Sequence, residues 1–307
     1  MKKLLAIILA VFAFSAQAKE TITIVYSWTA SDNAANFYRT LAFESNKIQD
    51  KYTFVVEAKP GAGASIGANY VDNNPDTTIL AHSSALFIRP LFYPEGSYDV
   101  KSFKSIMPMC TAPFIVTSTK YKSWKEVPTD KPLTIGQSGN GTTTHLVAAQ
   151  VAKNYPNMKV IAFKSTTDAF MSVLNGSTDF AVGFMGDAEA WLGPNSTKKV
   201  YVLGTTGKQP IKGIVTVPTL ASQGFPVDLK DMNTAQQLFV STKLPADKFK
   251  EVRAIFVKAA TEKSVKDSNA TDYCVPNNQM PDAELEKWFD FQNGFWKKIA
   301  ADITIQK

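Results

Sequence analysis

Short apolar runs rich in β-branched residues alternate along this chain with longer stretches of helical spacing, and this alternation constrains the fold more than any other feature. The first segments are a strand at 21–26, a helix at 33–45 and a strand at 53–57, which is the order of a β-α-β unit. The order continues through strands at 78–81, 133–136, 160–163 and 180–184 and helices at 65–71, 142–154 and 167–174. The pattern predicts an α/β protein with a parallel sheet, in which ligands bind at the carboxyl ends of the strands.

Two places along the chain indicate a passage between domains. A polar, turn-rich stretch begins at Thr117 between two strand-like runs, and a second crossing is plausible near Leu238. We therefore expect a discontinuous first domain and a continuous second one; the predicted bounds are 19–117 and 241–307 for the first domain and 118–240 for the second. Helices at 245–263 and 282–299 would complete the first domain. The aromatic residues at helical spacing in the later helix indicate packing against a core rather than a cofactor site.

The amino-terminal segment has the pattern of a secretory signal. Lys2 and Lys3 precede an apolar run from Leu4 to Phe14, and small residues occupy the cleavage positions that end at Ala18. The run is only eleven residues long, whereas a membrane-spanning helix needs about 20. We expect cleavage near Ala18 and a mature, soluble chain in the periplasm.

Charge and cysteine content narrow the classes of partner. Loss of Lys2 and Lys3 with the signal would lower the formal net charge from +6 to +4, without any block of basic residues, so nucleic acid is not an expected partner. After export, Cys110 and Cys274 can form a disulfide or remain two separate thiols, and their spacing does not decide between these states. No His, Cys or carboxylate cluster has metal-ligand spacing, so we expect neither a metal nor a cofactor.

A glycine-rich loop at 136–146 is the most informative stretch for function. It joins a predicted strand to a predicted helix and carries small hydroxyl residues at the helix start. The first N–H groups of a helix have no partner within the helix, and its dipole favours negative charge there, so this loop could hold a carboxylate without an arginine. The alternative is an ordinary helix cap by Ser or Thr.

A second glycine-rich loop, at 59–67, matches the sequence motifs of two classes of enzyme. As a nucleophile elbow it would use Ser65, but Pro60 to Ala64 separate Ser65 from the strand, and the chain has only two histidines to serve as a base. As a dinucleotide loop it lacks an acidic residue at the end of the next strand. An exported serine hydrolase that uses Ser65 is therefore the alternative from the enzyme class, and we expect no enzyme activity.

Several of these stretches, taken in order, resemble the solute receptors of tripartite tricarboxylate transporters, also called the Bordetella uptake gene type. The resemblance covers nearly the whole mature chain, and its specific parts are KPGAGASIGANYV and GQSGNGTTTHLVAAQVAK at their mutual distance. It is also carried by IAFKSTTDAFMSVLNGSTDFAVGF and by a carboxyl-terminal stretch that contains KWFDF.

This resemblance implies a periplasmic Venus-flytrap receptor, type II-like, of two α/β domains joined by two crossing strands. Such a monomer would close on a small carboxylate and deliver it to integral-membrane transporter subunits. The binding residues implied by position are Trp28, Thr29, Ala30, Ser31, Ser83, Ser84, Ser138, Gly139, Thr142, Thr143, Thr144, His145, Phe163, Lys164 and Phe184. The receptor of an ABC-type uptake system is the alternative that differs in its partner and not in its chemistry.

The first loop departs from the family pattern. Members commonly have paired glycines and an aspartate after a proline, whereas this chain has the sequence YSWTASD from Tyr26 to Asp32. An indole in place of glycine would narrow the pocket or form an aromatic wall. A compact or aromatic carboxylate is therefore an alternative to citrate.

Overall fold

The computed structural model describes residues 19–32, 34–213, 215–225, 227–270, 274–301 and 303. The predicted signal segment lies outside these residues. Within them, no helix is both long enough and apolar enough to span a membrane.

The first of two main sheets contains strands from both ends of the chain. Its order is β13-β4-β12-β3-β1-β2, with bounds β1 Glu20–Tyr26, β2 Tyr52–Ala58, β3 Thr78–Ser83, β4 Phe103–Ala112, β12 Thr234–Ser241 and β13 Val275–Pro276. Strands β1, β2 and β3 are parallel, as predicted, while β12 runs antiparallel to β3 and β4. The sheet is therefore mixed and not purely parallel, because β12 returns from the other half of the molecule.

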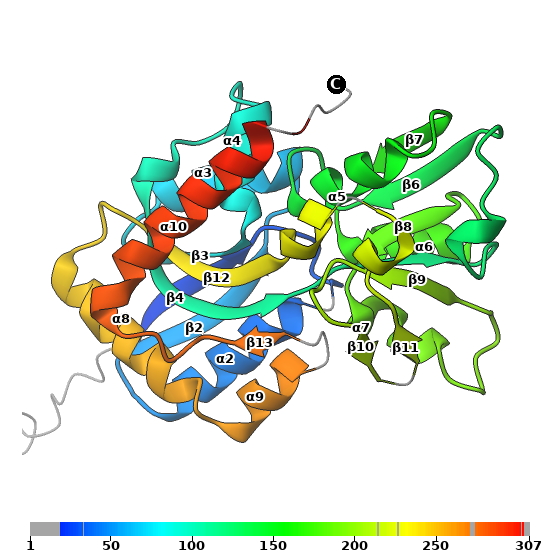
Figure 1. Ribbon diagram of the computed structural model, residues 1–307. Coiled ribbons are helices and arrows are strands. Elements are labelled where there is room, and N and C mark those ends of the chain that lie inside the picture. The colour runs from blue at the N-terminus through cyan, green and yellow to red at the C-terminus, as the bar shows by residue number, and fades with distance from the viewer. Residues whose placement is uncertain are drawn as a thin grey trace, which may run out of the picture.

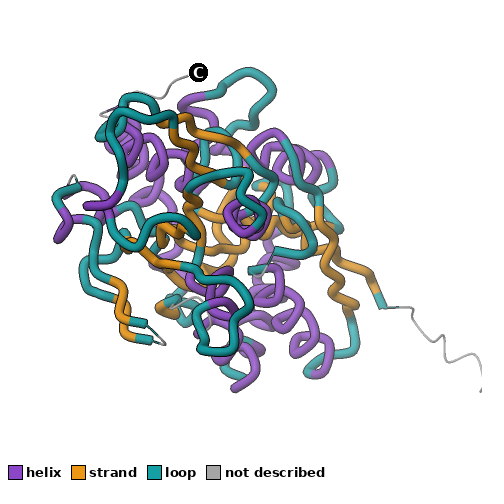
Figure 2. Tube along the Cα trace, turned by 90° about the vertical axis from the view of Figure 1, so that its right-hand side faces the viewer, coloured by secondary structure: helices purple, strands orange, loops and turns teal. Residues whose placement is uncertain are grey.

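Helices pack against the first sheet (Figure 1), and Figure 2 shows the whole molecule from the side, with helices in purple around strands in orange. Their bounds are α2 Ala35–Lys47, α3 Ser65–Asn73, α4 Ala85–Phe92, α8 Ala246–Ala259, α9 Lys263–Ala270 and α10 Asp282–Ala301. On α2, Phe37, Tyr38 and Leu41 are buried at helical spacing and belong to the same core as Ile22 and Ile24 of β1. Burial of this apolar stripe against the sheet favours the helix at this position.

The second sheet lies in the other half of the molecule (Figure 1). Its order is β7-β6-β8-β5-β9, with bounds β5 Ile115–Ser118, β6 Leu133–Gln137, β7 Met158–Ala162, β8 Phe180–Gly183 and β9 Tyr201–Thr205. The helices are α5 Thr143–Ala152, α6 Thr166–Leu174 and the short α7 Met185–Ala188; a small pair of strands is formed by β10 Ile211–Lys212 and β11 Thr216–Val217. Strands β6, β7 and β8 are parallel, and β5 is antiparallel to β8 and β9.

The chain passes between the sheets twice. It passes first between β4 and β5, which Figure 1 shows as one long path, and again between β9 and β12. The first passage lies between Ala112 and Ile115 and the second between Thr205 and Thr234, and the domain bounds at 117 and 240 stay predictions. Thr206 joins them: its N–H donates to Phe114 O at 2.9 Å, and its Oγ1 accepts from Phe114 N at 2.9 Å and donates to Asn233 Oδ1 at 3.2 Å.

The carboxyl-terminal part of the chain is fastened to the first sheet. Cys110 of β4 and Cys274 form a disulfide with a Cα–Cα distance of 5.4 Å, which settles the choice that the sequence left open. Arg253 of α8 is buried and donates from Nε to Asp282 Oδ1 and from Nη1 to Ile106 O, both at 2.6 Å. These bonds position the start of α10 against β4.

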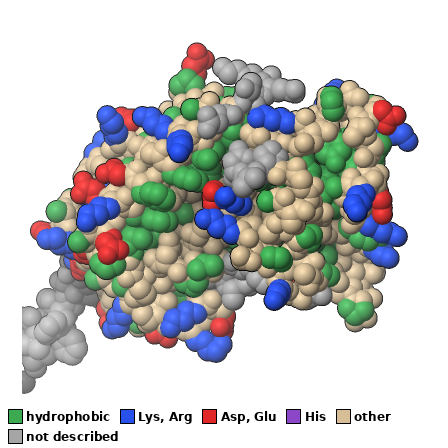
Figure 3. All heavy atoms as spheres, viewed as in Figure 1, with side chains coloured by type: hydrophobic (Ala, Val, Ile, Leu, Met, Phe, Trp, Pro, Cys, Tyr) green, Lys and Arg blue, Asp and Glu red, His purple; other side chains and the backbone are tan. Residues whose placement is uncertain are grey.

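One face of α10 is exposed and aromatic. Trp288 and Phe291 stack at a centroid distance of 6.0 Å, as do Phe291 and Phe295, and Phe291 is 59% exposed. The neighbouring face of the helix buries Leu285 and Trp296, in line with the packing that the helical spacing predicted. Figure 3 shows apolar side chains gathered over this helix, with charges of both signs scattered around them.

Candidate functional site

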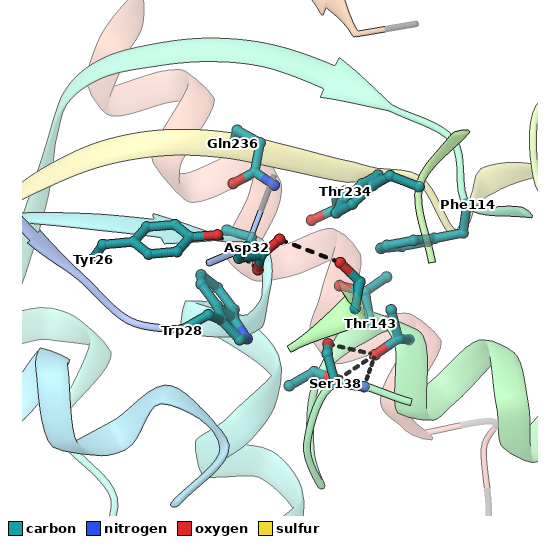
Figure 4. Close-up of a pocket in the computed structure, with 13 residues that line it drawn as sticks. Tyr26, Trp28, Asp32, Phe114, Ser138, Thr143, Thr234 and Gln236 are labelled. Atoms are coloured by element: carbon teal, nitrogen blue, oxygen red, sulfur yellow. Dashed lines mark hydrogen bonds between the residues drawn. The ribbon is translucent and has the colours of Figure 1, made fainter. Parts of the chain in front are cut away.

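The candidate site lies between the two halves of the molecule, where loops at the carboxyl ends of parallel strands meet. Tyr26 ends β1 and Ser83 ends β3, while Ser138 follows β6 and Phe184 follows β8. An inner cavity between them has a volume of about 20 Å³, which is room for one water molecule. Its lining residues, all drawn as sticks in Figure 4, are Tyr26, Trp28, Asp32, Ser83, Phe114, Ser138, Thr142, Thr143, Thr144, Thr166, Phe184, Thr234 and Gln236.

The amino terminus of α5 forms one wall of the inner cavity. Gly139 and Gly141 adopt positive φ angles of 123° and 78°, which turn the chain sharply from β6 into the helix. Thr142 is the N-cap, and its Oγ1 accepts a hydrogen bond from His145 N at 3.3 Å. The Thr144 hydroxyl lies 2.8 Å from Ser138 Oγ and accepts from Ser138 N at 3.0 Å. This network fixes the loop, so that the amino terminus of α5, whose residues Thr142 to Thr144 line the cavity, is held in a defined position.

Two hydroxyls of the inner cavity are not used by this network. Thr143 Oγ1 and Thr234 Oγ1 are buried, and neither has a hydrogen-bond partner among the described residues. A buried hydroxyl without a partner costs roughly 1–3 kcal/mol, so both groups are stabilised when a ligand supplies that partner. Thr234 comes from β12, the strand that returns from the second passage, and Phe114 comes from the first. The floor of the cavity is therefore formed by the connections between the domains.

The opposite wall is aromatic and acidic. Trp28 is 6% exposed and lies with ring centroids 5.6 Å from Tyr26 and 5.0 Å from His82. The Tyr26 hydroxyl donates to Asp32 Oδ2 at 2.8 Å. Figure 4 shows Tyr26, Trp28 and Asp32 on one side of the cavity, facing Ser138 and Thr143 on the other. The indole forms the aromatic wall that its place in the first loop suggested.

Asp32 faces a second carboxyl group across the domain boundary. Asp187 of α7 accepts from Phe184 N at 2.9 Å and from Thr167 Oγ1 at 2.7 Å, and Thr166 and Thr167 also approach Asp32 Oδ1 at 3.5 Å. Burial, followed by the charge of Asp187, raises the pKa of Asp32 to about 7, and burial raises the pKa of Asp187. The two carboxyl groups therefore hold protons more tightly than exposed ones.

An outer cavity of about 740 Å³ continues the cleft toward solvent. Trp28 and Ser138 line both cavities, so they stand at the passage from one to the other. The remaining outer lining residues are Ser27, Gly61, Ala62, Gly63, Ala64, Arg89, Gly139, Asn140, Ala162, Phe163, Lys164 and Asp168. Arg89 of α4 crosses the cleft and donates from Nη1 to Asn140 O at 2.6 Å, while its buried Nε has no partner among the described residues.

Most of the residues implied by the family resemblance meet at these two cavities. Trp28, Ser83, Ser138, Thr142, Thr143, Thr144 and Phe184 line the inner one, and Gly139, Phe163 and Lys164 line the outer one. Thr29, Ala30, Ser31, Ser84 and His145 line neither cavity. Ser84 Oγ accepts from Ala235 N at 2.9 Å, and His145 Nδ1 accepts from Gly141 N at 3.0 Å, so these two side chains hold loops in place.

Six lining residues of the inner cavity were not among those predicted: Tyr26, Asp32, Phe114, Thr166, Thr234 and Gln236. Tyr26 and Asp32 are the two ends of the first-loop segment, for which the sequence predicted that the indole of Trp28 could form an aromatic wall of the pocket. Phe114, Thr234 and Gln236 lie on the connecting strands or next to them, and no local motif marks them.

Ser65, the candidate nucleophile of the alternative enzyme reading, has no activating base. Its Oγ is buried without a hydrogen-bond partner in the described part of the chain, and Ser65 lines neither cavity. Burial lowers the pKa of both His82 and His145 to about 4. Among the described residues, no group of three or more His, Cys, Asp or Glu side chains could hold a metal ion.

A two-domain α/β molecule with a cavity between its domains, lined by loops from both, has the Venus-flytrap fold of periplasmic binding proteins. The model of the Tripartite tricarboxylate transporter family receptor (TctC) matches residues 38–280, and the chain belongs to this family of solute-binding receptors. No curated protein matches at a significant level.

Solved structures with the same fold share little sequence with this chain. Periplasmic binding protein BugD has a TM-score of 0.80 at 19% identity, over 92% of this chain and 97% of its own. MatC from Rhodopseudomonas palustris with bound malate has a TM-score of 0.79 at 16% identity, over 91% of this chain and 98% of its own. Rpa4515 from R. palustris with adipate has a TM-score of 0.77 at 16% identity, over 92% of this chain and 96% of its own. At these identities the likeness establishes the fold alone.

Proposed function

We propose that this chain is a periplasmic receptor that captures a small carboxylate between its domains and delivers it to a tripartite membrane transporter. The observation that carries the proposal is the amino terminus of α5, which faces the inner cavity together with the unpaired hydroxyls of Thr143 and Thr234. Helix N–H groups and hydroxyls donate to a carboxylate, and the helix dipole favours its charge. The relatives that hold malate and adipate support this ligand class.

Capture requires the domains to move. The inner cavity holds about one water molecule, so a ligand of several carbon atoms enters when the cleft is wider than in this arrangement. The hydrogen bond from Arg89 to Asn140 joins the two halves in this arrangement, so a wider opening of the cleft would break it. A ligand that bridges the domains therefore shifts the population toward the closed form, whose surface the transporter would recognise.

The first experiment is a thermal-shift screen of the chain from Lys19 onward against mono-, di-, tricarboxylates and aromatic carboxylates. A ligand at 100 times its Kd stabilises the folded state by about 2.7 kcal/mol and raises the melting temperature. Methyl esters of each hit serve as controls because they keep the shape and lose the charge. A folded protein with no shift for any carboxylate, or with equal shifts for acid and ester, would overturn the proposal.

The transporter partner needs a separate test. We expect ligand uptake into proteoliposomes that contain one large and one small membrane subunit of the tripartite type, and only when the loaded receptor is added. Uptake through an ABC-type permease instead would favour the alternative receptor class. Turnover of a model ester that Ser65→Ala abolishes would favour the hydrolase.

A further inference from the structure

Two buried carboxyl groups meet at the boundary between the two halves of the molecule, one from each half. Asp32 belongs to the loop after β1, and Asp187 lies on α7, which follows β8 of the second sheet. Their residues are 4% and 9% exposed. Among the described residues, neither carboxyl group forms an ion pair with Lys or Arg. A buried carboxylate without a counter-ion is costly, and a second one nearby adds to the cost.

Two threonine hydroxyls at the start of α6 connect the carboxyl groups. Thr167 Oγ1 donates to Asp187 Oδ1 at 2.7 Å and lies 3.5 Å from Asp32 Oδ1. Thr166 Oγ1 lies 3.5 Å from the same oxygen of Asp32 and also bonds Asp187. A hydroxyl has a single proton to donate, so a threonine that donates to Asp187 cannot give Asp32 a second short bond. The connection therefore lacks one proton when both carboxyl groups are ionised.

The other hydrogen bonds of Asp32 come from its own half of the molecule. Its Oδ2 accepts from the Tyr26 hydroxyl at 2.8 Å, and its carboxyl group also accepts from Ala34 N, just before α2. Opening of the cleft leaves these bonds in place, because Tyr26 and Ala34 move together with Asp32. The contacts with Thr166 and Thr167 cross the boundary, so they are the contacts that form on closure and that a change of protonation alters.

We propose, on the basis of the proposed function, that Asp32 and Asp187 form a proton-dependent latch, which holds the two domains closed over the ligand while the pair carries a proton. A proton on Asp32 lets this carboxyl group donate to Thr167 or Thr166. A proton on Asp187 lets it donate to Thr167, whose own proton then turns toward Asp32. Either placement completes a continuous chain of hydrogen bonds between the domains. Loss of the proton leaves two buried charges that repel each other.

The sign of the pH effect follows from the hydration of the two groups. When the cleft opens, both carboxyl groups gain water, and their pKa values return toward the ordinary 3.8. In the closed arrangement burial, followed by the charge of Asp187, raises the pKa of Asp32 to about 7, and burial raises the pKa of Asp187. Closure therefore takes up a proton between about pH 4 and pH 7, and a rise of pH through this window opposes it. A neutral Asp32 also removes a negative charge from the cavity that a carboxylate approaches.

The other titratable groups around the pair lie on β1, α2 and α6. Asp32 faces Tyr26, Tyr38 and Asp168 in addition to Asp187, and Asp187 faces Tyr26 and Asp168. Burial raises the pKa of both tyrosines above the ordinary 10, so neither ionises in this window. Asp168 is the remaining acid beside the pair and provides a matched control.

The pH dependence of ligand affinity tests the latch. For a carboxylate found in the screen, after correction for its own ionisation, we expect calorimetry to show an affinity loss of at least about tenfold from pH 5 to pH 8, because closure takes up one proton. Asp187→Asn removes this loss: the amide is uncharged, its oxygen can accept from Phe184 N, and its N–H can donate to Thr167. Asp187 lines neither cavity, so the variant keeps the ligand contacts. Asp168→Asn keeps the loss of affinity with pH.

X-ray scattering of the ligand-free protein gives a second readout. We expect a smaller radius of gyration at pH 5 than at pH 8 in the wild type, and equal radii at the two pH values in Asp187→Asn. Thr167→Val is a second variant, which keeps both acids and removes the hydroxyl between them, so it reduces the difference in radius. Circular dichroism verifies that each variant folds.

The outcomes separate the latch from the proposed function. An affinity that is equal at pH 5 and pH 8, or a loss that Asp187→Asn retains, overturns the latch and leaves the carboxylate receptor standing. If the folded protein binds no carboxylate at any pH, the proposed function fails, and equal wild-type radii at the two pH values then overturn the latch as well. A pH dependence that Asp168→Asn removes as fully as Asp187→Asn would also contradict the latch, because the total acidity of the cleft would then be the cause.

Discussion

Thr142 and Thr143 are adjacent in the sequence and have different tasks at the start of α5. The Thr142 hydroxyl caps the helix, whereas Thr143 Oγ1 is buried in the inner cavity without a partner. We predict that Thr143→Val, which keeps the shape, lowers carboxylate affinity about tenfold and raises the free energy of unfolding of the ligand-free protein by roughly 1–3 kcal/mol, because the hydroxyl that it removes is buried without a partner. Calorimetry and urea unfolding measure the two quantities.

Thr142→Val is the matched control for stability. Loss of the cap lowers the free energy of unfolding by about 1 kcal/mol, because His145 N loses its acceptor. Wild-type affinity in Thr143→Val would show that its hydroxyl does not contact the ligand. An unchanged stability in Thr142→Val would contradict the role of the cap.

Asp32 also makes stability depend on pH. Its folded-state pKa of about 7 lies above the ordinary 3.8, so between these values the folded state holds a proton that the unfolded state releases. Asp32 therefore costs stability as pH rises through this window. His82 and His145, whose pKa is lowered to about 4, have the opposite effect, since they favour unfolding as pH falls below about 6.5.

The comparison with Asp32→Asn isolates the carboxyl group, because both histidines remain in both proteins. We predict that the variant gains stability relative to the wild type as pH rises from about 4 to about 7. Urea unfolding across this range measures the difference. A difference that stays constant with pH would show that Asp32 titrates normally in the folded protein.

The sequence predicted one wall of the site better than the others. Hydroxyl residues directly after a glycine-rich turn are a local sequence pattern that indicates a helix start able to bind an anion. Thr142 to Thr144 have this pattern. Asp32 has no such signal, because only the folded loop places its carboxyl group inside the cavity. Thr234 and Gln236 belong to a strand whose place beside the cleft depends on contacts across more than one hundred residues.

At the scale of elements, the two glycine-rich loops meet across the cleft. Gly63 has a φ of 59°, and a Cβ there would collide with the backbone oxygen of Asn140 in the other loop. We predict that Gly63→Ala weakens ligand binding about tenfold, because the added methyl group opposes closure. Calorimetry with the carboxylate found in the screen measures the loss.

Gly96→Ala is the matched control for backbone strain. Gly96 has a similar φ of 68°, but a Cβ there would meet no atom within 4 Å. Both variants lose roughly 1 kcal/mol of stability from the positive φ, and only Gly63→Ala loses affinity. Equal affinity in the two variants would contradict the contact between the loops as a feature of the closed form.

Periodicity predicted most helices and the parallel strands, because each depends on a local pattern of burial. It did not predict that β5 and β12 run antiparallel to their neighbours. Strand direction in these two cases depends on the path of the chain between the domains. The same limit applies to the pairing of Cys110 with Cys274, since 164 residues separate them.

At the scale of the whole molecule, this disulfide encloses both passages between the domains and the entire second sheet. A crosslink that closes so long a loop restricts the unfolded chain, and the entropy lost corresponds to about 5 kcal/mol by the loop-closure relation, with 2–5 kcal/mol commonly measured. We predict that Cys110→Ala combined with Cys274→Ala lowers the free energy of unfolding within this range. Neither cysteine lines a cavity, so the affinity for the ligand stays unchanged.

Urea unfolding with and without a reductant measures the effect. The wild type loses stability when reduced, and the double variant shows no further loss, which separates the crosslink from other effects of the reductant. Equal stability of the oxidised wild type and the double variant would show that the bond does not form in the mature protein. A loss of affinity together with stability would instead indicate that the disulfide, through β4, helps to position the passage at Phe114 that forms part of the cavity floor.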